Sequence, residues 1–231
     1  NMLGHLLSSD ERYSLQKCSV TVGYQLSYPD ETISQLSPQE CTKLKREGLY
    51  ICMIKNPNPV AKNVTPQLSD AAFIREKVPM TKEEIRHVSI CKLHLKSDSV
   101  FYDVGSGTGS IAVEAASLSD DMEVYAIEQK ENAVQLIMQN KEKHGLENIH
   151  VINAKAPDGM DNLPVPTHAF IGGSGGNLKE IIEALKAKNP HIRIVINAIS
   201  METICEIKEI LSAYDVKNED IVQLQVSRSK Q

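Results

Sequence analysis

The chain has 231 residues, 41% of them hydrophobic and 24% charged, which allows one large globular domain or one domain plus a fragment. No apolar run approaches the roughly 18–20 residues of a membrane span, and charged residues follow the N-terminus too soon for a signal peptide. The net charge of −5 disfavours non-specific binding to nucleic acid. The five scattered cysteines form no CxxC or Cys/His pattern, so we expect free thiols in a reducing cytoplasm, without a zinc site or a disulfide framework.

The first 55 residues differ in character from the rest. Apolar and polar residues alternate in "CSVTVGYQL" (18–26), and a short apolar run, "GLYICMIK" (48–55), follows a charged helix-like piece. Both runs predict short strands, in a segment too short to be an enzyme domain with its own core. The Pro- and Asn-rich stretch "NPNPVAKNVTPQ" (56–67) is typical of a linker. We therefore place an α+β fragment at 1–55, a linker at 56–70 and the main domain at 71–231.

In the main domain, predicted helices alternate with predicted strands. The first helix is expected to begin at a T-x-x-E capping box formed by Thr81 and Glu84. This alternation predicts βαβ units and an α/β class, Rossmann-like, doubly wound and mostly parallel sheet. Six strands are predicted, at 100–104, 123–127, 149–152, 168–171, 192–199 and 221–227.

The loop after the first of these strands, "DVGSGTGS" (103–110), carries glycines at 105, 107 and 109. In a doubly wound sheet, ligands bind at the carboxyl ends of the strands, beside the point where the strand order reverses. The dinucleotide fingerprint G-x-G-x-x-G would need glycine at 110, where this chain has Ser110. We therefore expect the loop to bind the methionine part of S-adenosylmethionine (SAM).

Glu128 ends the second predicted strand, where a carboxylate can accept hydrogen bonds from both hydroxyls of a ribose. One alternative is a plain strand–helix turn with a solvated Glu128. Another is an NAD-type oxidoreductase, which Ser110 and the absence of an obvious catalytic Tyr/Lys or His/Asp pair disfavour.

A second glycine-rich stretch, "FIGGSGGNL" (170–178), follows the fourth predicted strand, which we expect to lie beside the first. Asn177 is expected to cap the next helix, with Glu180 completing an N-x-x-E box. Glycines allow close backbone approach, and successive N–H groups near a helix start can hold a carboxylate. A mobile turn is the alternative to our interpretation, which is a floor for a large carboxylate-bearing ring beside the methyl group of SAM.

Three motifs carry a resemblance that extends over residues 73–228: "KVPMTKEE" (77–84), the loop at 103–110 and "GGSGG" (172–176). Together they resemble the decarboxylating precorrin methyltransferases of cobalamin biosynthesis, far more specifically than the loop alone. The resemblance implies SAM-dependent methyl transfer to carbon 15 of a precorrin, with decarboxylation of the ring C acetate. The first 55 residues are similar to the tail of the carbon-5 tetrapyrrole methylase domain, which many organisms fuse ahead of the carbon-15 enzyme, as in precorrin-6Y methyltransferase. The resemblance also implies a further strand beyond Gln231 and a homotetramer.

The resemblance assigns SAM contacts to eight residues of this chain: Thr81, Gly105, Ser106, Gly107, Thr108, Gly109, Glu128 and Ala156. At 154–157 the family commonly has G-D-A-P and this chain has A-K-A-P, so Lys155 replaces the acid that would bond the adenine amine. His168 stands where the family often has Asp or Asn, and we interpret it as a structural histidine at the start of a strand.

A polycarboxylate substrate on an acidic chain requires a local basic patch. Candidates are Arg75, Lys77, Lys82 and Arg86 around the first helix and Lys179 after the second glycine stretch, although each is equally well explained as a solvated surface charge. The predicted substrate-binding set is Lys82, Arg86, Gly172, Gly173, Ser174, Gly175 and Gly176. A reduced tetrapyrrole supplies an electron-rich carbon through its own ring nitrogens, so the protein mainly positions the two reactants, and we predict neither a catalytic triad nor a metal.

Three functions remain open at this point: the precorrin carbon-15 methyltransferase, a SAM-dependent methyltransferase of the same fold acting on RNA or protein, and a non-catalytic SAM-binding or assembly module. The acidic balance argues against RNA. For the leading hypothesis we expect a cytoplasmic homo-oligomer, possibly a tetramer, with no nucleic-acid or membrane partner.

Overall fold

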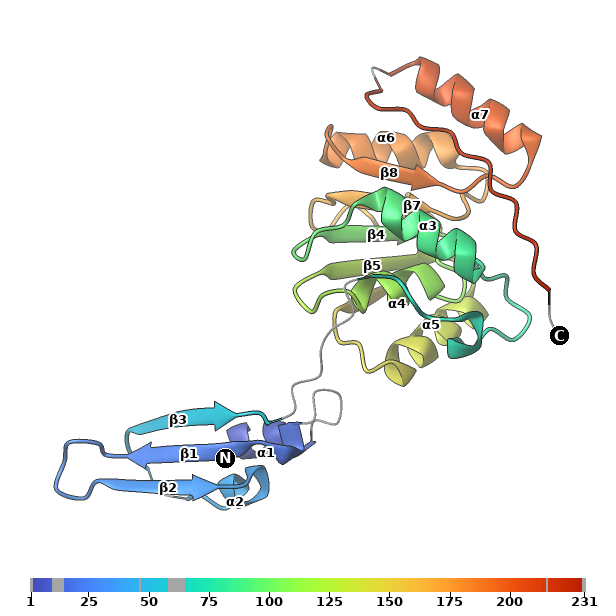
Figure 1. Cartoon of the computed structure of the whole chain (residues 1–231). Helices are drawn as coiled ribbons and strands as arrows, with labels where there is room; N and C mark the ends of the chain where they lie inside the picture. The colour runs from blue at the N-terminus through green and yellow to red at the C-terminus, as the bar shows by residue number, and fades with distance from the viewer. Residues whose placement is uncertain (1, 10–14, 46, 58–64, 215, 230–231) are drawn as a thin grey trace. The chain divides into compact units, whose positions relative to one another are not determined.

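The computed structural model describes residues 2–9, 15–45, 47–57, 65–214 and 216–229. The chain divides into two compact units, residues 1–62 and 63–231 (Figure 1). Each unit has its own sheet and its own buried apolar cluster. None of the helices in the described ranges is long and apolar enough to cross a membrane.

The first unit is a small antiparallel sheet with strand order β2-β1-β3. Val20 and Val22 of β1 point to the same face and are buried with Leu7 and Cys41. The predicted strands at 18–26 and 48–55 are confirmed, whereas the strand at 32–36 was not predicted. The elements are α1 (Met2–Ser9), a 3-10 turn (Leu15–Lys17), β1 (Ser19–Tyr24), β2 (Thr32–Leu36), α2 (Pro38–Thr42) and β3 (Tyr50–Lys55).

The second unit is a parallel five-stranded sheet with strand order β6-β5-β4-β7-β8 (Figure 1). This order confirms the predicted Rossmann-like, doubly wound α/β fold. After a 3-10 turn (Asp70–Ala72), the elements are α3 (Glu83–Leu93), β4 (Val100–Val104), α4 (Ser110–Ala116), β5 (Glu123–Glu128), α5 (Glu131–Lys143), β6 (Ile149–Asn153), β7 (His168–Ile171), α6 (Leu178–Lys188), β8 (Arg193–Ile196) and α7 (Met201–Ser212).

The prediction of a sixth strand at 221–227 is wrong. Residues 216–229 have no regular secondary structure, and the apolar side chains at 221, 222, 224 and 226 are exposed. Figure 1 draws this segment as a plain red trace. Its contacts to α3 are made by side chains: Arg228 donates two hydrogen bonds to Glu84, at 2.8 and 2.7 Å, and Lys92 pairs with Asp220. An alternating apolar pattern becomes a strand only where a neighbouring strand supplies backbone partners, and β8 does not pair with this segment.

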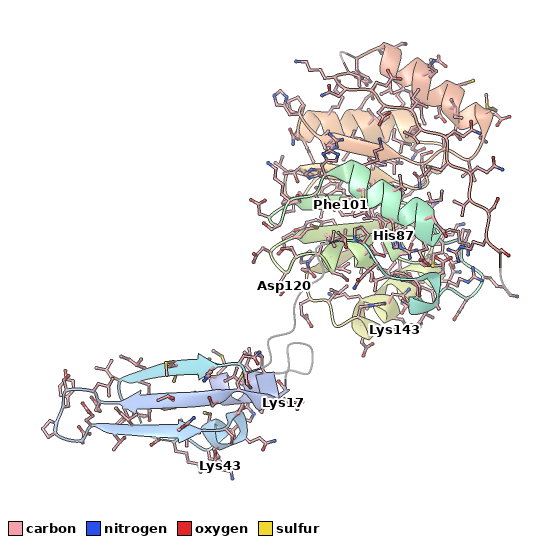
Figure 2. All side chains as sticks on the ribbon, viewed as in Figure 1. Lys17, Lys43, His87, Phe101, Asp120 and Lys143 are labelled. Carbon is pink, nitrogen blue, oxygen red and sulfur yellow. The ribbon has the colours of Figure 1, made fainter. Side chains whose placement is uncertain are left out.

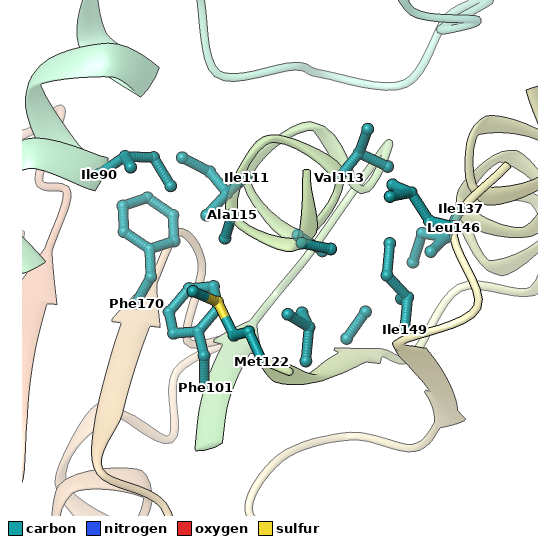
Figure 3. Packing of buried hydrophobic residues seen from close by; sticks show 14 of the residues in the cluster. Ile90, Phe101, Ile111, Val113, Ala115, Met122, Ile137, Leu146, Ile149 and Phe170 are labelled. Carbon is teal, nitrogen blue, oxygen red and sulfur yellow. The ribbon is translucent and has the colours of Figure 1, made fainter. Parts of the chain in front are cut away.

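Side chains that alternate along the strands fill two apolar layers, one on each face of the sheet. Phe101 and Phe170 pack with Ile90 of α3, Ile111 of α4 and Ile137 of α5 on one face (Figure 3). On the other face, strand residues pack against α6 and α7; this layer contains Tyr102, Val104, Tyr125, Ile127, Ala169, Ile171, Ile181, Leu185 and Ile210. Because both faces are covered, the three central strands β4, β5 and β7 are mostly buried, and only the ends of the sheet can present loops to a ligand.

The helix α3 does not begin as predicted. Lys82 stands at its N-cap position, and Thr81 makes no capping hydrogen bond. Asp70 replaces the expected cap: its Oδ1 accepts the Glu83 N–H at 2.9 Å, while the Glu83 carboxylate accepts the Asp70 N–H at 3.3 Å. This reciprocal bonding satisfies the helix start from a residue distant in sequence, which a local T-x-x-E pattern cannot reveal.

Candidate functional site

Four neighbouring strands bring the predicted site residues to one edge of the sheet. The first glycine loop (105–109) follows β4, Glu128 ends β5, Ala156 follows β6, and the second glycine run (172–176) follows β7. Since these strands are parallel and adjacent, their carboxyl ends lie side by side, which is where doubly wound sheets bind ligands.

The backbone of the first glycine loop is held in a conformation that needs glycine. Gly105, Gly107 and Gly109 have φ of 70°, 58° and 77°, in the left-handed region. The N–H groups of Gly105 and Ser106 both donate to the carbonyl of Ile127, at 3.0 and 3.2 Å. A Cβ on Gly109 would lie 3.1 Å from Ile137 of α5, so Gly109 also allows α4 and α5 to approach closely.

The Glu128 carboxylate is buried and fixed at the rim of this loop. Its Oε2 accepts the Gly107 N–H and its Oε1 accepts the Lys130 N–H, both at 2.9 Å. Each carboxylate oxygen can accept a second hydrogen bond. The two oxygens can therefore still receive two ligand hydroxyls, as the sequence pattern predicts.

Asp103, which the sequence did not indicate as a site residue, holds the first glycine loop in place by hydrogen bonds. Its Oδ2 accepts hydrogen bonds from the Ser106 hydroxyl at 2.6 Å and from the Ala112 N–H at 3.1 Å. Burial raises the pKa of Asp103 to about 7; the two hydrogen bonds lower it and the nearby Glu128 charge adds to the rise. Asp103 Oδ1 and the Thr108 hydroxyl, both buried, have no hydrogen-bond partner among the described residues.

The second glycine run lies directly against the first glycine loop. The Gly172 N–H donates to the carbonyl of Val104 at 3.0 Å, and a Cβ on Gly105 would lie 2.3 Å from the carbonyl oxygen of Gly173. By contrast, a Cβ on Gly173 or Gly176 would meet nothing within 4 Å. One side of the run therefore packs on the loop, and the other side is open.

Asn177 is at the N-cap position of α6 as predicted, but its side chain makes no capping bond. Its Nδ2 instead donates to the carbonyl of Ala156 at 3.1 Å. The prediction of an N-x-x-E box is therefore wrong. This amide ties the loop after β6 to the end of the second glycine run, which brings Ala156 to the same site.

Thr81 lies on the segment that leads into α3. A Cβ on Gly107 would lie 3.1 Å from the carbonyl oxygen of Pro79, so this segment passes close to the first glycine loop. The Thr81 carbonyl accepts a hydrogen bond from Arg86 Nη1 at 2.8 Å. The structure thus brings Pro79, two residues before Thr81, close to the loop and anchors the Thr81 carbonyl.

Arg86 is fully buried, and its position does not support the prediction that it binds substrate. Its guanidinium bonds Glu114 at 3.0 Å, Asp70 at 3.3 Å and the Leu68 carbonyl, and it lies over the Phe73 ring at 4.6 Å. His87, labelled in Figure 2, has Nε2 3.6 Å from the same Glu114. This cluster joins α3, α4 and the segment before α3, which gives Arg86 a structural role. Lys82 is exposed, 3.6 Å from Asp70.

Asn140 is a second residue that the sequence reading missed. It is buried on α5, where its Oδ1 accepts the Ile74 N–H at 2.7 Å and its Nδ2 donates to the carbonyls of Ile74 and Thr108, at 2.8 and 2.9 Å. It thereby fastens the segment before α3 to the first glycine loop. The signal was an amide one turn after Leu136, on the apolar face of the helix.

His168 lies at the opposite edge of the sheet, at the amino end of β7. It is buried beside Thr167, whose hydroxyl is 2.8 Å from its Nδ1, and burial lowers its pKa. This position fits the structural interpretation of His168. No three His, Cys, Asp or Glu side chains in the described ranges are grouped as metal ligands would be.

The comparisons with known proteins identify the family. The precorrin methyltransferase domain family matches residues 71–231. A probable cobalt-precorrin-6B C(15)-methyltransferase (decarboxylating) of Sulfurisphaera tokodaii is 38% identical over 167 residues, 71% of this chain and 86% of that protein. The cobalt-precorrin-6B C(15)-methyltransferase (decarboxylating) of Salmonella typhimurium is 36% identical over 162 residues, 69% and 83% of the two chains.

Solved structures agree with this assignment. The precorrin-6Y C5,15-methyltransferase of Geobacter metallireducens has a TM-score of 0.62 and 35% identity, covering 66% of this chain and 82% of that one. A tRNA (m1A58) methyltransferase of Aquifex aeolicus, with a TM-score of 0.53, 14% identity and 85% and 80% coverage, shares the fold alone. The chain therefore belongs to the precorrin methyltransferase domain family and is an enzyme of the methyltransferase class.

Proposed function

We propose that the chain is a SAM-dependent methyltransferase that acts on carbon 15 of a precorrin and removes the carboxylate of the ring C acetate, in cobalamin biosynthesis. The printed names of the relatives describe this reaction, and they match the domain that carries the site. The observation that supports the proposal is the backbone contact between Gly105 and Gly173, which sets the segment that we assign to the cofactor beside the segment that we assign to the substrate.

The residues at the carboxyl edge fit SAM. Three left-handed glycines set the backbone conformation of the loop, and Glu128 offers a fixed carboxylate to two ribose hydroxyls. We assign the cofactor contacts to Thr81, Gly105, Ser106, Gly107, Thr108, Gly109, Glu128 and Ala156. When bound, SAM supplies an electrophilic methyl group on a sulfonium.

The residues of this chain act by positioning. The first glycine loop fixes one reactant, and the open side of the second glycine run offers a flat surface for the other, directly beside it. Holding two reactants in a productive geometry supplies up to about 7–11 kcal/mol of a barrier, so a site without a strong nucleophile is sufficient for this chemistry. The electrons released by decarboxylation pass into the conjugated ring of the substrate. We assign the substrate surface to residues 172–176, with Lys82 as an exposed basic neighbour.

The test is a methyl-transfer assay with purified protein, labelled SAM and a precorrin-6Y-type substrate, read by mass spectrometry for gain of a methyl group and loss of carbon dioxide. Calorimetry with S-adenosylhomocysteine measures cofactor binding separately. We expect both turnover and binding. Protein that binds no S-adenosylhomocysteine, together with a Glu128→Ala variant that behaves as wild type, would falsify the proposal.

A methyltransferase of the same fold acting on RNA or protein is the second candidate, because RNA-modifying enzymes share this architecture. The net charge of −5 weighs against an RNA substrate. Bulk tRNA offered in the same assay separates the two, since methyl transfer to tRNA and none to the precorrin would favour the alternative. Binding of cofactor without any turnover would favour a non-catalytic module.

The remaining expectations belong to the same proposal: a cytoplasmic protein without nucleic-acid or membrane partners, which assembles as a homo-oligomer, possibly a tetramer. Light scattering of the full chain measures the assembly. For residues 1–55 we propose kinship with the tail of the carbon-5 tetrapyrrole methylase domain, on the strength of the sequence resemblance.

A further inference from the structure

We propose that Lys155 binds a carboxylate of the substrate above the second glycine run. This inference rests on the function proposed above and deepens it by naming a subsite. Lys155 follows β6 and is exposed. Its ammonium group makes no hydrogen bond or ion pair with any residue that the structure describes. An unpaired cation at the rim of a ligand site is available to an anion.

Two side chains converge on the second glycine run from neighbouring strands. A Cβ on Gly175 would lie 3.6 Å from Cε of Lys155 and 3.4 Å from Nε2 of Gln129. Gln129 immediately follows Glu128, so the amide reaches the run from the end of β5 and the ammonium from the end of β6. Both groups present N–H donors.

The glycine run is open on either side of the point where these donors reach it, so a ligand can lie against the run next to them. A Cβ on Gly173 or Gly176 would meet nothing within 4 Å, so the surface beside Gly175 is open. The hydrogen bond from Asn177 Nδ2 to the Ala156 carbonyl, at 3.1 Å, holds the loop of Lys155 against the end of the run. The base of the lysine side chain is therefore fixed relative to the glycines.

The chemistry of the donors selects the ligand. An ammonium has three hydrogen-bond donors and no acceptor, so it opposes an amine and complements a carboxylate. Glu128 has the reverse preference, since a buried carboxylate accepts hydrogen bonds from hydroxyls. The site thus separates into a side for hydroxyls at Glu128 and a side for acidic groups at Lys155. A substrate with several carboxylates is what the second side recognises.

The experiment uses the full chain saturated with S-adenosylhomocysteine and uroporphyrin III, an octacarboxylate macrocycle, as a fluorescent probe that requires no turnover. We expect Lys155→Met to weaken probe binding about three- to tenfold at low salt, and the loss to shrink as salt rises. Lys155→Arg keeps the charge and is expected to stay within about twofold of wild type. The matched control is Lys143→Met, which removes an exposed charge at the C-terminal end of α5. Lys143 is labelled in Figure 2.

A Lys155→Met variant that binds the probe as tightly as Lys143→Met would overturn the inference. So would a variant that loses affinity for S-adenosylhomocysteine instead, because that result would place Lys155 at the cofactor.

Turnover of the precorrin distinguishes a failure of this inference from a failure of the proposed function. If wild type binds the probe through Lys155 but does not methylate the precorrin, only the proposed function fails. If wild type methylates the precorrin and Lys155→Met leaves both KM and probe binding unchanged, only the subsite fails. Wild type that neither binds the probe nor turns over the precorrin overturns both.

Discussion

The carbonyl oxygen of Gly173 lies 2.3 Å from the position that a Cβ atom on Gly105 would occupy. Real Cβ atoms do not approach backbone oxygens so closely, so residue 105 must be glycine for the two segments to touch. Gly105 belongs to the loop that follows β4, and Gly173 to the run that follows β7. The contact is therefore the place where the two halves of the proposed site meet.

Replacing Gly105 tests this contact. Gly105→Ala places a side chain at φ +70° and against backbone that cannot rotate away. We expect the free energy of unfolding to fall by about 2 kcal/mol or more, together with loss of S-adenosylhomocysteine binding. Urea unfolding and calorimetry measure the two effects. Unchanged affinity would show that the loop adapts without cost.

Gly173→Val is the complementary variant, because a Cβ there meets nothing within 4 Å and no left-handed φ is involved. We expect stability and cofactor affinity like those of the wild type. Precorrin turnover should fall at least about tenfold, because a bulky side chain would occupy the open side of the second glycine run. The comparison of kcat/KM with the calorimetric Kd gives the answer. Unchanged turnover would contradict the assignment of the second glycine run to substrate binding.

Removing the charge of Glu128 is expected to weaken cofactor binding. A charge-assisted hydrogen bond contributes about 1.5–3 kcal/mol, so Glu128→Gln is expected to raise the Kd for S-adenosylhomocysteine about 10- to 100-fold. Glu123→Gln, at the amino end of the same strand, is the matched control and is expected to leave the Kd unchanged. If the two changes altered the Kd equally, Glu128 would not be a cofactor-binding residue.

Arg86 and Lys82 provide a pair of basic residues in unlike surroundings. Arg86→Met removes the guanidinium partner of the buried Glu114 carboxylate, which typically costs about 3–5 kcal/mol of unfolding free energy. Lys82→Met removes an exposed cation and is expected to cost less than about 1 kcal/mol. Denaturant titration separates them, and similar losses would contradict the structural role of Arg86.

Asp103 makes stability depend on pH. Its pKa is about 7 in the folded chain and near 3.8 when solvated, so the folded state holds the proton more tightly. The favourable contribution of this group is complete below about pH 4 and is lost as the pH rises to about 7. Asp103→Asn keeps an acceptor and does not ionise. We therefore expect the stability of wild type relative to this variant to fall between about pH 4 and pH 7 and then to level off. A constant difference in denaturant midpoints across this range would contradict the raised pKa.

The sequence was sufficient to predict the elements that depend on local patterns. The strands β4 to β8, the glycine loop after β4 and the position of Glu128 follow from alternation and turn chemistry within a few residues. The helix α5 ends just before Gly145, which has a left-handed φ, and glycine after a run of helical residues is a helix-end signal that the sequence itself carries. Such features are encoded where they occur, so a single sequence reveals them.

The features that the sequence did not predict depend on distant partners. Asp70 caps α3 across 13 residues, and Arg86 is buried because Glu114 is 28 residues away. The sequence indicated Thr81 as a helix cap from its spacing to Glu84, and Arg86 as a substrate-binding cation from its charge. Both predictions missed contacts that come from other elements. The segment 221–227 has the alternating pattern of a strand, but no neighbouring strand pairs with it. The pattern of a segment does not show whether such a partner is present.

The two hydrogen bonds between the Asn140 side chain and the Ile74 backbone affect how often the backbone at Ile74 opens to solvent. The Ile74 N–H is closed off by a side chain that is itself completely buried on α5. In hydrogen exchange with deuterium, this amide should behave like those of the central strands, although it lies outside any helix or strand. The Ile74 amide would then exchange by global unfolding, and a ligand would enter the site without breaking the bonds between Asn140 and Ile74.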